Sequence, residues 1–382
     1  MSGFVTILIA LLVFALMIVV HEFGHFAVAK LFKIHVVEFA VGMGPAIFKK
    51  KHRDTTYALR CIPFGGYCMF DDDVGNSDSP NAFEKAAWWK RLCVVLAGAF
   101  LNILLGFLVF VILQAATPQT YSPKITKIVP QSGMEASVFQ PGDEVLRLNN
   151  TDIHIKDDID LFMHLNGDAP VLVTAKRNGE IIQDTVVPCK AEYVATYYEN
   201  EMELVTKING VETERQTLPP PEVQNYTSYI GTTETIETTL LGFEGTQEKA
   251  TFASVLRDAF YTTIYSVKNV YMSLLMLIRG QVKPTEVSGP VGVVAIIGQA
   301  TQYGWMSVLS LLGLLTVNLG IMNLLPIPGL DGCKAITTVI EGITKKKLPP
   351  KVEGYINMVG FALLILLMLF ATFNDVKNLF MN

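Results

Sequence analysis

The pentapeptide His21-Glu22-Phe23-Gly24-His25 has the residue types and the spacing of a metal-dependent hydrolase. On an α-helix, histidines at positions i and i+4 lie on one face, where both can bind the same zinc ion. The glutamate after the first histidine then stands beside the metal, where it can act as a general base. A catalytic zinc site usually has three protein ligands and a water molecule, so the motif needs one more ligand from elsewhere in the chain.

Asp331 is the candidate for that third ligand. It follows Pro326, Pro328 and Gly329 and precedes Gly332, and these residues break a helix and turn the chain. A carboxylate within or near a bilayer is costly unless it binds a cation, which favours a metal ligand. The alternative is that Asp331 caps a helix that begins near Gly332.

The surroundings of the HExxH motif are apolar, although such motifs usually face water. The eighteen residues from Gly3 to Val20 carry no charge, and the only ionisable residues within Gly3–Ala29 are those of the motif. As a helix this segment would be roughly 40 Å long, more than the ~30 Å hydrocarbon core of a bilayer. Ionisable residues at that depth are usually functional. The alternative is a chance match in which the two histidines merely pair with neighbouring side chains.

The composition is that of a membrane protein with several spans and a soluble portion. Mean hydropathy is +0.38, 51% of the residues are hydrophobic and 17% are charged. The net charge of −5 argues against a nucleic-acid partner. No Lys or Arg precedes Lys30, so the first segment lacks the basic start of a cleavable signal peptide.

Hydrophobic patterning predicts an α-helical membrane protein with four transmembrane helices, at about Gly3–Ala29, Leu92–Ala115, Trp305–Leu325 and Tyr355–Phe373. A fifth apolar stretch, Phe252–Ile278, contains three charged residues. It therefore predicts an amphipathic helix on the membrane surface rather than a span.

Basic residues predict the orientation of the spans. Residues 27–91 carry ten Lys and Arg, and a second basic cluster, Lys345-Lys346-Lys347, follows the third span. By the positive-inside rule both loops are cytoplasmic. We therefore expect both termini and the segment 116–304 to be extracytoplasmic, with the HExxH motif nearer the cytoplasmic face.

The segment between the second and third spans contains a β-rich module. The sequence IVPQSGMEASVFQPGDEVLRLNN resembles a PDZ domain, in which a strand and a helix form a groove for an extended peptide. Asn178-Gly179 joins two strand-like runs as a type I′ turn would. The alternative is a generic small β domain. Residues 190–250 are rich in Thr and Glu, and there we expect short strands or a linker.

These motifs together resemble the site-2 protease family of intramembrane zinc metalloproteases, most closely the bacterial regulator-of-sigma-E protease group. The resemblance covers the spans, the first cytoplasmic loop and the PDZ-like module, and the stretch Ser288–Val293 also matches. It implies that His21, His25 and Asp331 hold one catalytic Zn²⁺, with Glu22 as the base. It also implies that Asn323 lies near the scissile carbonyl, and Asn318 matches a further family position.

The family resemblance also gives the first cytoplasmic loop a role. The sequence FAVGMGPAIFKKKHRDTTYALRCIPFGGYCMF is similar to the membrane-reentrant β-hairpin of the family. An edge strand there, containing Gly65, Gly66 and Tyr67, could pair with an unwound substrate helix and replace its lost hydrogen bonds. The alternative is a purely structural hairpin. Some relatives carry two PDZ modules, whereas one is convincing here.

We therefore expect a polytopic α-helical membrane protein with a membrane-associated β-hairpin and an extracytoplasmic PDZ-like α+β domain. The expected parts are the first two spans with the hairpin, the PDZ-like domain, an extension or linker, the amphipathic helix with its connection, and the last two spans, at residues 1–115, 116–190, 191–250, 251–304 and 305–382.

The expected function is an intramembrane zinc endopeptidase of the bacterial inner membrane. Its substrates would be single-span membrane proteins, such as anti-sigma-factor-like proteins or signal-peptide remnants, cut by a zinc-activated water. A peptide would be a further ligand, in the PDZ groove. One alternative is a non-catalytic membrane-tethered PDZ scaffold, in which the HExxH motif or the aspartate would have eroded. Another is a metal transporter, which usually shows paired internal repeats that we do not find.

Overall fold

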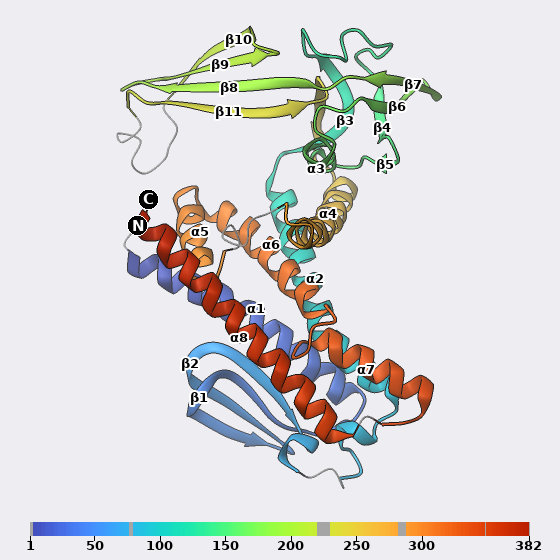
Figure 1. Cartoon of the computed structure of the whole chain (residues 1–382), viewed down its shortest axis with the longest axis vertical. Coiled ribbons are helices and arrows are strands. Elements are labelled where there is room, and N and C mark those ends of the chain that lie inside the picture. Colours follow the sequence, from blue (N-terminus) through green and yellow to red (C-terminus); the bar gives the residue numbers. More distant parts are fainter. Residues whose placement is uncertain (1–2, 76–78, 220–229, 282–287, 348, 382) are drawn as a thin grey trace. The chain divides into compact units, whose positions relative to one another are not determined.

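The computed structural model describes residues 3–75, 79–219, 230–281, 288–347 and 349–381. The chain divides into two compact units (Figure 1). One unit, the helical unit, comprises Met1–Val109 and Ser266–Asn382, and the other, the β unit, comprises Phe110–Tyr265. Each unit is described by itself.

Four of the described helices are long and apolar enough to cross a membrane, as the sequence predicts. They are α1 (Gly3–Leu31), α2 (Trp88–Ala116), α6 (Trp305–Asn323) and the segment Gly354–Lys377 of α8 (Pro350–Met381). The predicted fifth apolar stretch forms α4 (Phe252–Ile278), which is not among these four. Two shorter helices, α5 (Pro290–Gln302) and α7 (Asp331–Thr344), also belong to the helical unit.

Helices α1 and α2 cross at glycines. A side chain at Gly24 of α1 would meet the backbone of Ala97 of α2 at 2.5 Å. Small residues let two helices approach closely where lipid supplies no hydrophobic driving force for their association. The Gly24 in the middle of the HExxH motif therefore lets α2 lie directly against the face that carries both histidines.

The loop between α1 and α2 forms the predicted hairpin, from β1 (Val36–His52) and β2 (Thr55–Phe70). The hairpin is folded back on itself, because Val36–Val41 pairs on one side with Gly66–Phe70 and on the other with Thr56–Leu59. Gly66–Phe70 is consequently an outer segment, and no other described strand pairs with its free edge.

A buried carboxylate holds the folded hairpin together. Glu38 of β1 accepts hydrogen bonds from Arg60 at 2.5 Å and from the Tyr67 hydroxyl at 2.7 Å, and it pairs with Lys49 at 2.9 Å. Burial alone would raise the pKa of Glu38, but the hydrogen bonds from Tyr67, Lys49 and Arg60 outweigh it and lower this pKa to about 2. Glu38 thus joins the outer segment, through Tyr67, to the neighbouring part of β2 through Arg60 and to the opposite edge of the hairpin through Lys49.

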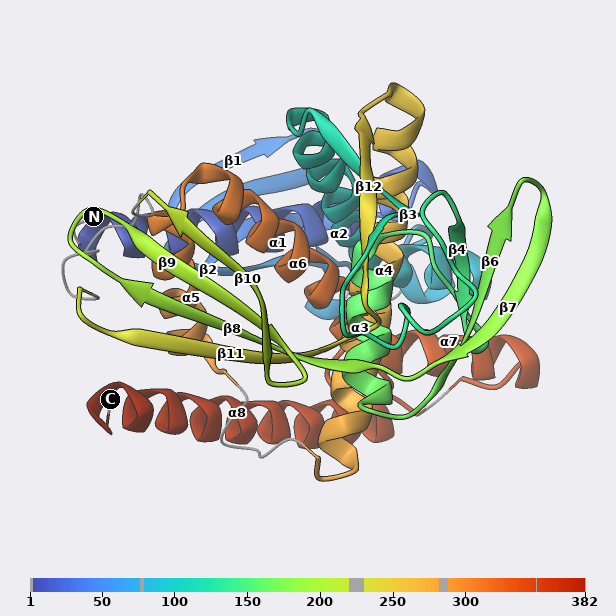
Figure 2. The same ribbon diagram turned by 90° about the horizontal axis from the view of Figure 1, so that it is seen from above.

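The β unit contains two sheets, which Figure 2 shows from above. The first has the order β12-β3-β4-β6-β7 with β5 paired to β4. Its strands are β3 (Gln119–Ile128), β4 (Glu144–Leu148), β5 (Thr151–Asp152), β6 (Val171–Arg177), β7 (Glu180–Val186) and β12 (Phe243–Lys249). The helix α3 (Lys156–Asn166) packs on it through Ile159 and Met163, which share a core with Ile125, Leu148 and Val173.

Positive φ angles at Asn178 and Gly179 confirm the predicted two-residue turn between β6 and β7. The same pair of residue types, Asn209-Gly210, turns β9 into β10.

The region expected to be short strands or a linker forms a second, four-stranded sheet. Its order is β10-β9-β8-β11, and its strands are seven to nine residues long: β8 (Cys189–Tyr197), β9 (Met202–Ile208), β10 (Val211–Leu218) and β11 (Thr233–Leu240). The Thr- and Glu-rich composition fits long strands with exposed side chains, since most residues of β10 and β11 are exposed.

Strand β12 returns to the first sheet and pairs with β3, from Phe243 opposite Ile128 to Lys249 opposite Gln119. Leu241 and Phe243 pack in the core of that sheet. The fold that begins in the predicted 116–190 module therefore includes a strand that the sequence analysis placed in the 191–250 extension.

Candidate metal centre

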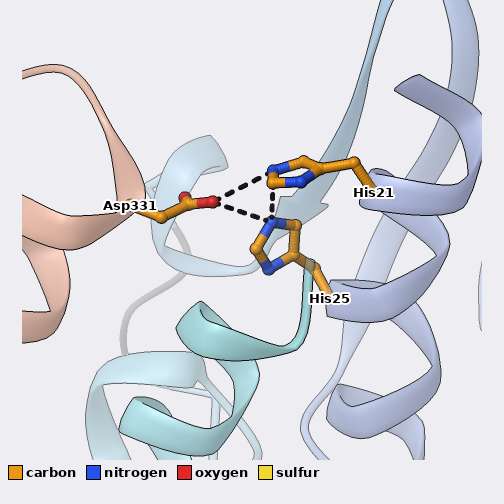
Figure 3. Close-up of side chains that lie close together, drawn as sticks. All are labelled: His21, His25 and Asp331. Atoms are coloured by element: carbon orange, nitrogen blue, oxygen red, sulfur yellow. Dashed lines mark hydrogen bonds and ion pairs between the residues drawn. The ribbon is translucent and has the colours of Figure 1, made fainter. Parts of the chain in front are cut away.

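The two histidines of the HExxH motif lie one turn apart on α1, with their ring centroids 4.8 Å apart (Figure 3). Their Nε2 atoms are separated by 3.2 Å. Both side chains are nearly buried, with exposed fractions of 10% for His21 and 12% for His25. The helix thus presents two nitrogen atoms to one point, as the i, i+4 spacing predicts.

The third member of the cluster arrives from the other end of the chain. Asp331 is the first residue of α7, which begins after the Pro-Gly turn that follows α6. A side chain at Gly332 would collide with the backbone carbonyls of Leu324 and Leu325, so the turn is tight and needs glycine there. This turn brings Asp331 Oδ2 to 3.0 Å from His21 Nε2 and 3.3 Å from His25 Nε2.

The three atoms have the spacing of zinc ligands. In a tetrahedral site with bonds of ~2.0–2.1 Å, two ligand atoms lie about 3.3 Å apart. The three separations among His21, His25 and Asp331 are 3.2, 3.0 and 3.3 Å. Among the described residues, theirs is the cluster of His, Cys, Asp and Glu side chains whose ligand atoms converge closely enough to hold a metal.

Hydrogen bonding shows that the convergent atoms are acceptors. His25 Nδ1 lies 2.8 Å from the Val94 carbonyl, which can only accept, so Nδ1 carries the proton and Nε2 presents a lone pair. Asp331 Oδ2 is buried, and its polar neighbours in the described part of the chain are the Nε2 atoms of the two histidines. When both rings are neutral and carry their proton on Nδ1, three acceptor atoms face one another, which a cation would stabilise, and the residues therefore fit zinc.

A glycine on α2 leaves room beside the cluster. A Cβ atom at Gly98 would lie 2.5 Å from His25 Nε2 and 2.8 Å from the His21 ring. Any side chain there would fill the space that a metal and its water need. Gly98 and Gly24 together therefore let α2 cover the histidines without blocking them.

Glu22 lies on the side of α1 that faces the hairpin. Its carboxyl group is close to both histidines, Asp331 and the backbone amide of Cys68. A Cβ atom at Gly66 would be 3.1 Å from Glu22 Cγ, so the outer segment of the hairpin touches the glutamate. The predicted base and the predicted substrate-binding glycine are thus neighbours.

The other predicted site residues differ in their distance from the cluster. Asn323, the last residue of α6, has its side-chain nitrogen 3.4 Å from His21 Nε2. Asn318 is exposed and has no hydrogen bond to the described residues of the cluster. The Tyr67 hydroxyl donates a hydrogen bond to Glu38 and not to a residue of the cluster. Gly65 has a φ angle of +82° and lies against the end of the Met43 side chain.

Two partners of the histidines were not found from the sequence. They are Val94, which acts through its backbone carbonyl, and Asn102, whose side chain faces His21 Nδ1 at 3.4 Å. Both lie on α2, on the side that meets α1. The sequence held one signal for these partners. Gly98 and Asn102 lie four residues apart within a mostly apolar span.

An HExxH helix that meets a carboxylate at zinc spacing, in a chain with four helices able to span a membrane, defines the class of membrane metalloproteases. Comparison with known proteins agrees. The chain belongs to peptidase family M50, the site-2 protease family, whose family model matches residues 9–367.

Relatives match along the whole chain. A Clostridium acetobutylicum protein named "Putative zinc metalloprotease" is 32% identical over 374 residues, covering 98% of each chain. A Clostridium perfringens protein of the same description is 32% identical over 371 residues, covering 97% of this chain and 98% of its own. The zinc metalloprotease RasP of Shouchella clausii is 26% identical over 455 aligned positions, covering 98% and 99%.

Proposed function

We propose that the protein is an intramembrane zinc endopeptidase that cuts single-span membrane proteins within or near their transmembrane segments. The observation that carries this proposal is the position of the cluster. His21 and His25 lie in an apolar 29-residue helix able to span a bilayer, and Asp331 converges on them at ligand spacing. Membership of a zinc metalloprotease family supports the same reaction.

Three side chains would hold the metal, and Glu22 would move the proton. When bound, zinc supplies a Lewis acid that lowers the pKa of a water molecule to about 7 and polarises the substrate carbonyl. Glu22, beside both histidines, takes the proton from the attacking water and returns it to the leaving amine. Asn323, beside His21, donates a hydrogen bond to the carbonyl oxygen as negative charge develops there.

The hairpin would hold the substrate in an extended form. A transmembrane helix conceals its peptide bonds, so it must unwind before water can attack, and the freed backbone groups need partners. Gly66–Phe70 has a free edge and touches Glu22. Strand addition at this edge, with Gly65, Gly66 and Tyr67 along the substrate, would replace the helical hydrogen bonds beside the base. We assign no role to Asn318 beyond its place on the same helix as Asn323.

The β unit would select substrates by size. It resembles a PDZ domain in sequence, and a PDZ groove takes a peptide as an added strand. Here β3 is paired on one side with β12 and on the other with β4, so a peptide cannot add to β3 without displacing one of them. A peptide could add only at an edge strand of this sheet, β12 or β7. The role proposed for the β unit is obstruction of bulky extracytoplasmic substrates.

We place the protein in the bacterial cytoplasmic membrane, with both termini and the β unit outside. The ten Lys and Arg of residues 27–91 and the cluster Lys345-Lys346-Lys347 put both short loops on the cytoplasmic side. The lipid bilayer and single-span proteins are then its partners, and a nucleic acid is not.

Cleavage of candidate single-span substrates by the purified protein tests the proposal. Cleavage should stop when zinc is removed with a chelator and return when zinc alone is added back. A non-catalytic scaffold on the same fold would instead bind substrates without cutting them under either condition.

A further inference from the structure

Asn102 is a buried polar residue of the helical unit to which neither the HExxH motif nor the carboxylate assigns a task. It lies on α2 and its exposed fraction is 0%. The amide has one side-chain neighbour at hydrogen-bonding range, His21 Nδ1 at 3.4 Å, through Nδ2, while Oδ1 has no partner within the described residues. A buried amide that is only half satisfied is unfavourable compared with an apolar residue of the same shape, so its contact with His21 is a candidate for a specific role.

The tautomer of His21 decides which amide atom faces it. His21 Nε2 is the nitrogen that points to Asp331 Oδ2 and His25 Nε2, so it must present a lone pair if a metal binds there. A neutral imidazole has one proton, which then resides on Nδ1. An N–H of Asn102 facing the N–H of His21 would be two donors without an acceptor.

Rotating the side-chain amide of Asn102 by 180° resolves this conflict. The oxygen and nitrogen of an asparagine amide exchange places with almost no change of shape, so Oδ1 can occupy the position next to His21 Nδ1. His25 has the same arrangement, since its Nδ1–H donates to the Val94 carbonyl at 2.8 Å. Both histidines would then be oriented by oxygen acceptors on α2.

We propose that Asn102 is a positioning residue that accepts a hydrogen bond from His21 Nδ1–H through Oδ1 and thereby aims Nε2 at the metal. The inference rests on the proposed zinc site. Outer partners of this kind fix the tautomer and orientation of a ligating histidine and raise its basicity, and losing one typically weakens metal binding 10–100-fold.

Zinc affinity of the purified full-length protein, measured by competition with a chelating dye, tests this role without any substrate. Asn102→Leu has nearly the same size and no acceptor, and it should weaken zinc binding at least about tenfold. Asn102→Asp keeps an acceptor and removes the donor, and it should bind zinc within about threefold of the parent or more tightly. If the leucine variant is not recovered folded, Asn102→Ala takes its place with the same expectation.

Thr316→Val is the matched control. Thr316 is buried beside Asn102 and donates to its backbone carbonyl at 3.3 Å, and among the described residues this is the hydrogen bond found for its side chain. This variant should lose thermal stability but keep the parent's zinc affinity.

Three results are informative. Unchanged affinity in Asn102→Leu would show that Asn102 only packs, and equal weakening in the leucine and aspartate variants would show that it donates rather than accepts. Either result overturns the inference while leaving the zinc site intact. A parent protein that binds no zinc would instead contradict the proposed function.

Discussion

Gly98 of α2 lies against His25 of α1 so closely that one methyl group on Gly98 would come within 2.5 Å of His25 Nε2. We therefore expect Gly98→Ala to lower zinc affinity at least about tenfold, because the histidine must move away from Asp331 to make room. Chelator competition measures this. Gly106→Ala is the control, since a methyl group there crowds Val317 of α6 and not the histidines. Equal zinc binding by the two alanine variants would contradict this account of the site.

The second prediction concerns Glu22. Glu22→Gln should bind zinc as the parent does but cleave substrates about 10²–10⁴-fold more slowly, because an amide cannot take the proton of the water. Turnover of a single-span substrate and zinc content should be measured on the same preparation. Near-normal turnover with full zinc would remove Glu22 from the mechanism.

Substitutions of Asp331 and of Asn323 should have different effects on zinc content and activity. Asp331→Ala removes a proposed ligand, so zinc content and activity should fall together. Asn323→Ala removes a donor to the developing oxyanion, so activity should fall about 10²–10³-fold while zinc stays bound. Full zinc occupancy in Asp331→Ala would demote Asp331 to a residue that only supports the site.

The stability of the folded hairpin should depend on pH through the ionisation of Glu38. An unfolded glutamate has a pKa near 4.3, whereas in the folded hairpin the pKa of Glu38 is about 2. A lowered folded-state pKa contributes stability that is fully present above about pH 4.3 and is lost as the pH falls towards 2. Cys68 lies in the outer segment, and burial raises its pKa, so its reaction with thiol reagents reports opening of the hairpin.

Labelling of Cys68 with a disulfide reagent that is active in acid measures this opening, in a background where the other four cysteines, Cys61, Cys93, Cys189 and Cys333, are replaced by serine. The rate should rise below about pH 4 in the parent protein, and Glu38→Gln should label faster already at neutral pH. Lys49→Gln removes a half-exposed partner and should have a smaller effect. Identical labelling of the parent and Glu38→Gln at neutral pH would show that the carboxylate does not hold the hairpin.

The outer segment of the hairpin should matter for every substrate. Tyr67→Pro removes a backbone donor and bends the strand, so it should slow cleavage of short substrates and of those with large external domains alike. Tyr67→Phe keeps the backbone and loses only the bond to Glu38, so it should be milder. Selective loss of cleavage for bulky substrates alone would instead assign the segment to size selection.

The local part of the metal centre was predictable because its geometry follows from helix periodicity. His21 and His25 are one turn apart on any helix, and an apolar run identifies the spans. Asp331 could be chosen as a candidate ligand because a carboxylate beside a bilayer is energetically costly unless it binds a cation. Its approach to α1, however, depends on the tight turn at Gly332. That approach is a tertiary contact, which neither the spacing nor the cost of the carboxylate shows, and the family resemblance only supported the choice of Asp331.

The partners of the histidines on α2 and the pairing of β12 with β3 could not be predicted, because they depend on contacts between distant segments. Val94 acts through a carbonyl, which every residue has, and Asn102 matters only because α2 crosses α1 at Gly24 and Gly98. In the β unit, Asn178-Gly179 predicted its turn, and Asn209-Gly210 could have predicted a second one by the same rule. The return of β12 to β3 has no local signal, because more than a hundred residues separate paired positions such as Gln119 and Lys249.

That pairing has a consequence for how the protein can change over evolution. The first and last strands of the β unit lie side by side, and Ala250 donates to the Pro118 carbonyl at 3.1 Å just beyond them. A segment whose two ends meet can be excised and bridged by a short turn, because little chain is needed to close the gap. We therefore expect the segment 118–250 to tolerate growth, shortening or replacement, while α1, which carries both histidines, keeps its connection to α2.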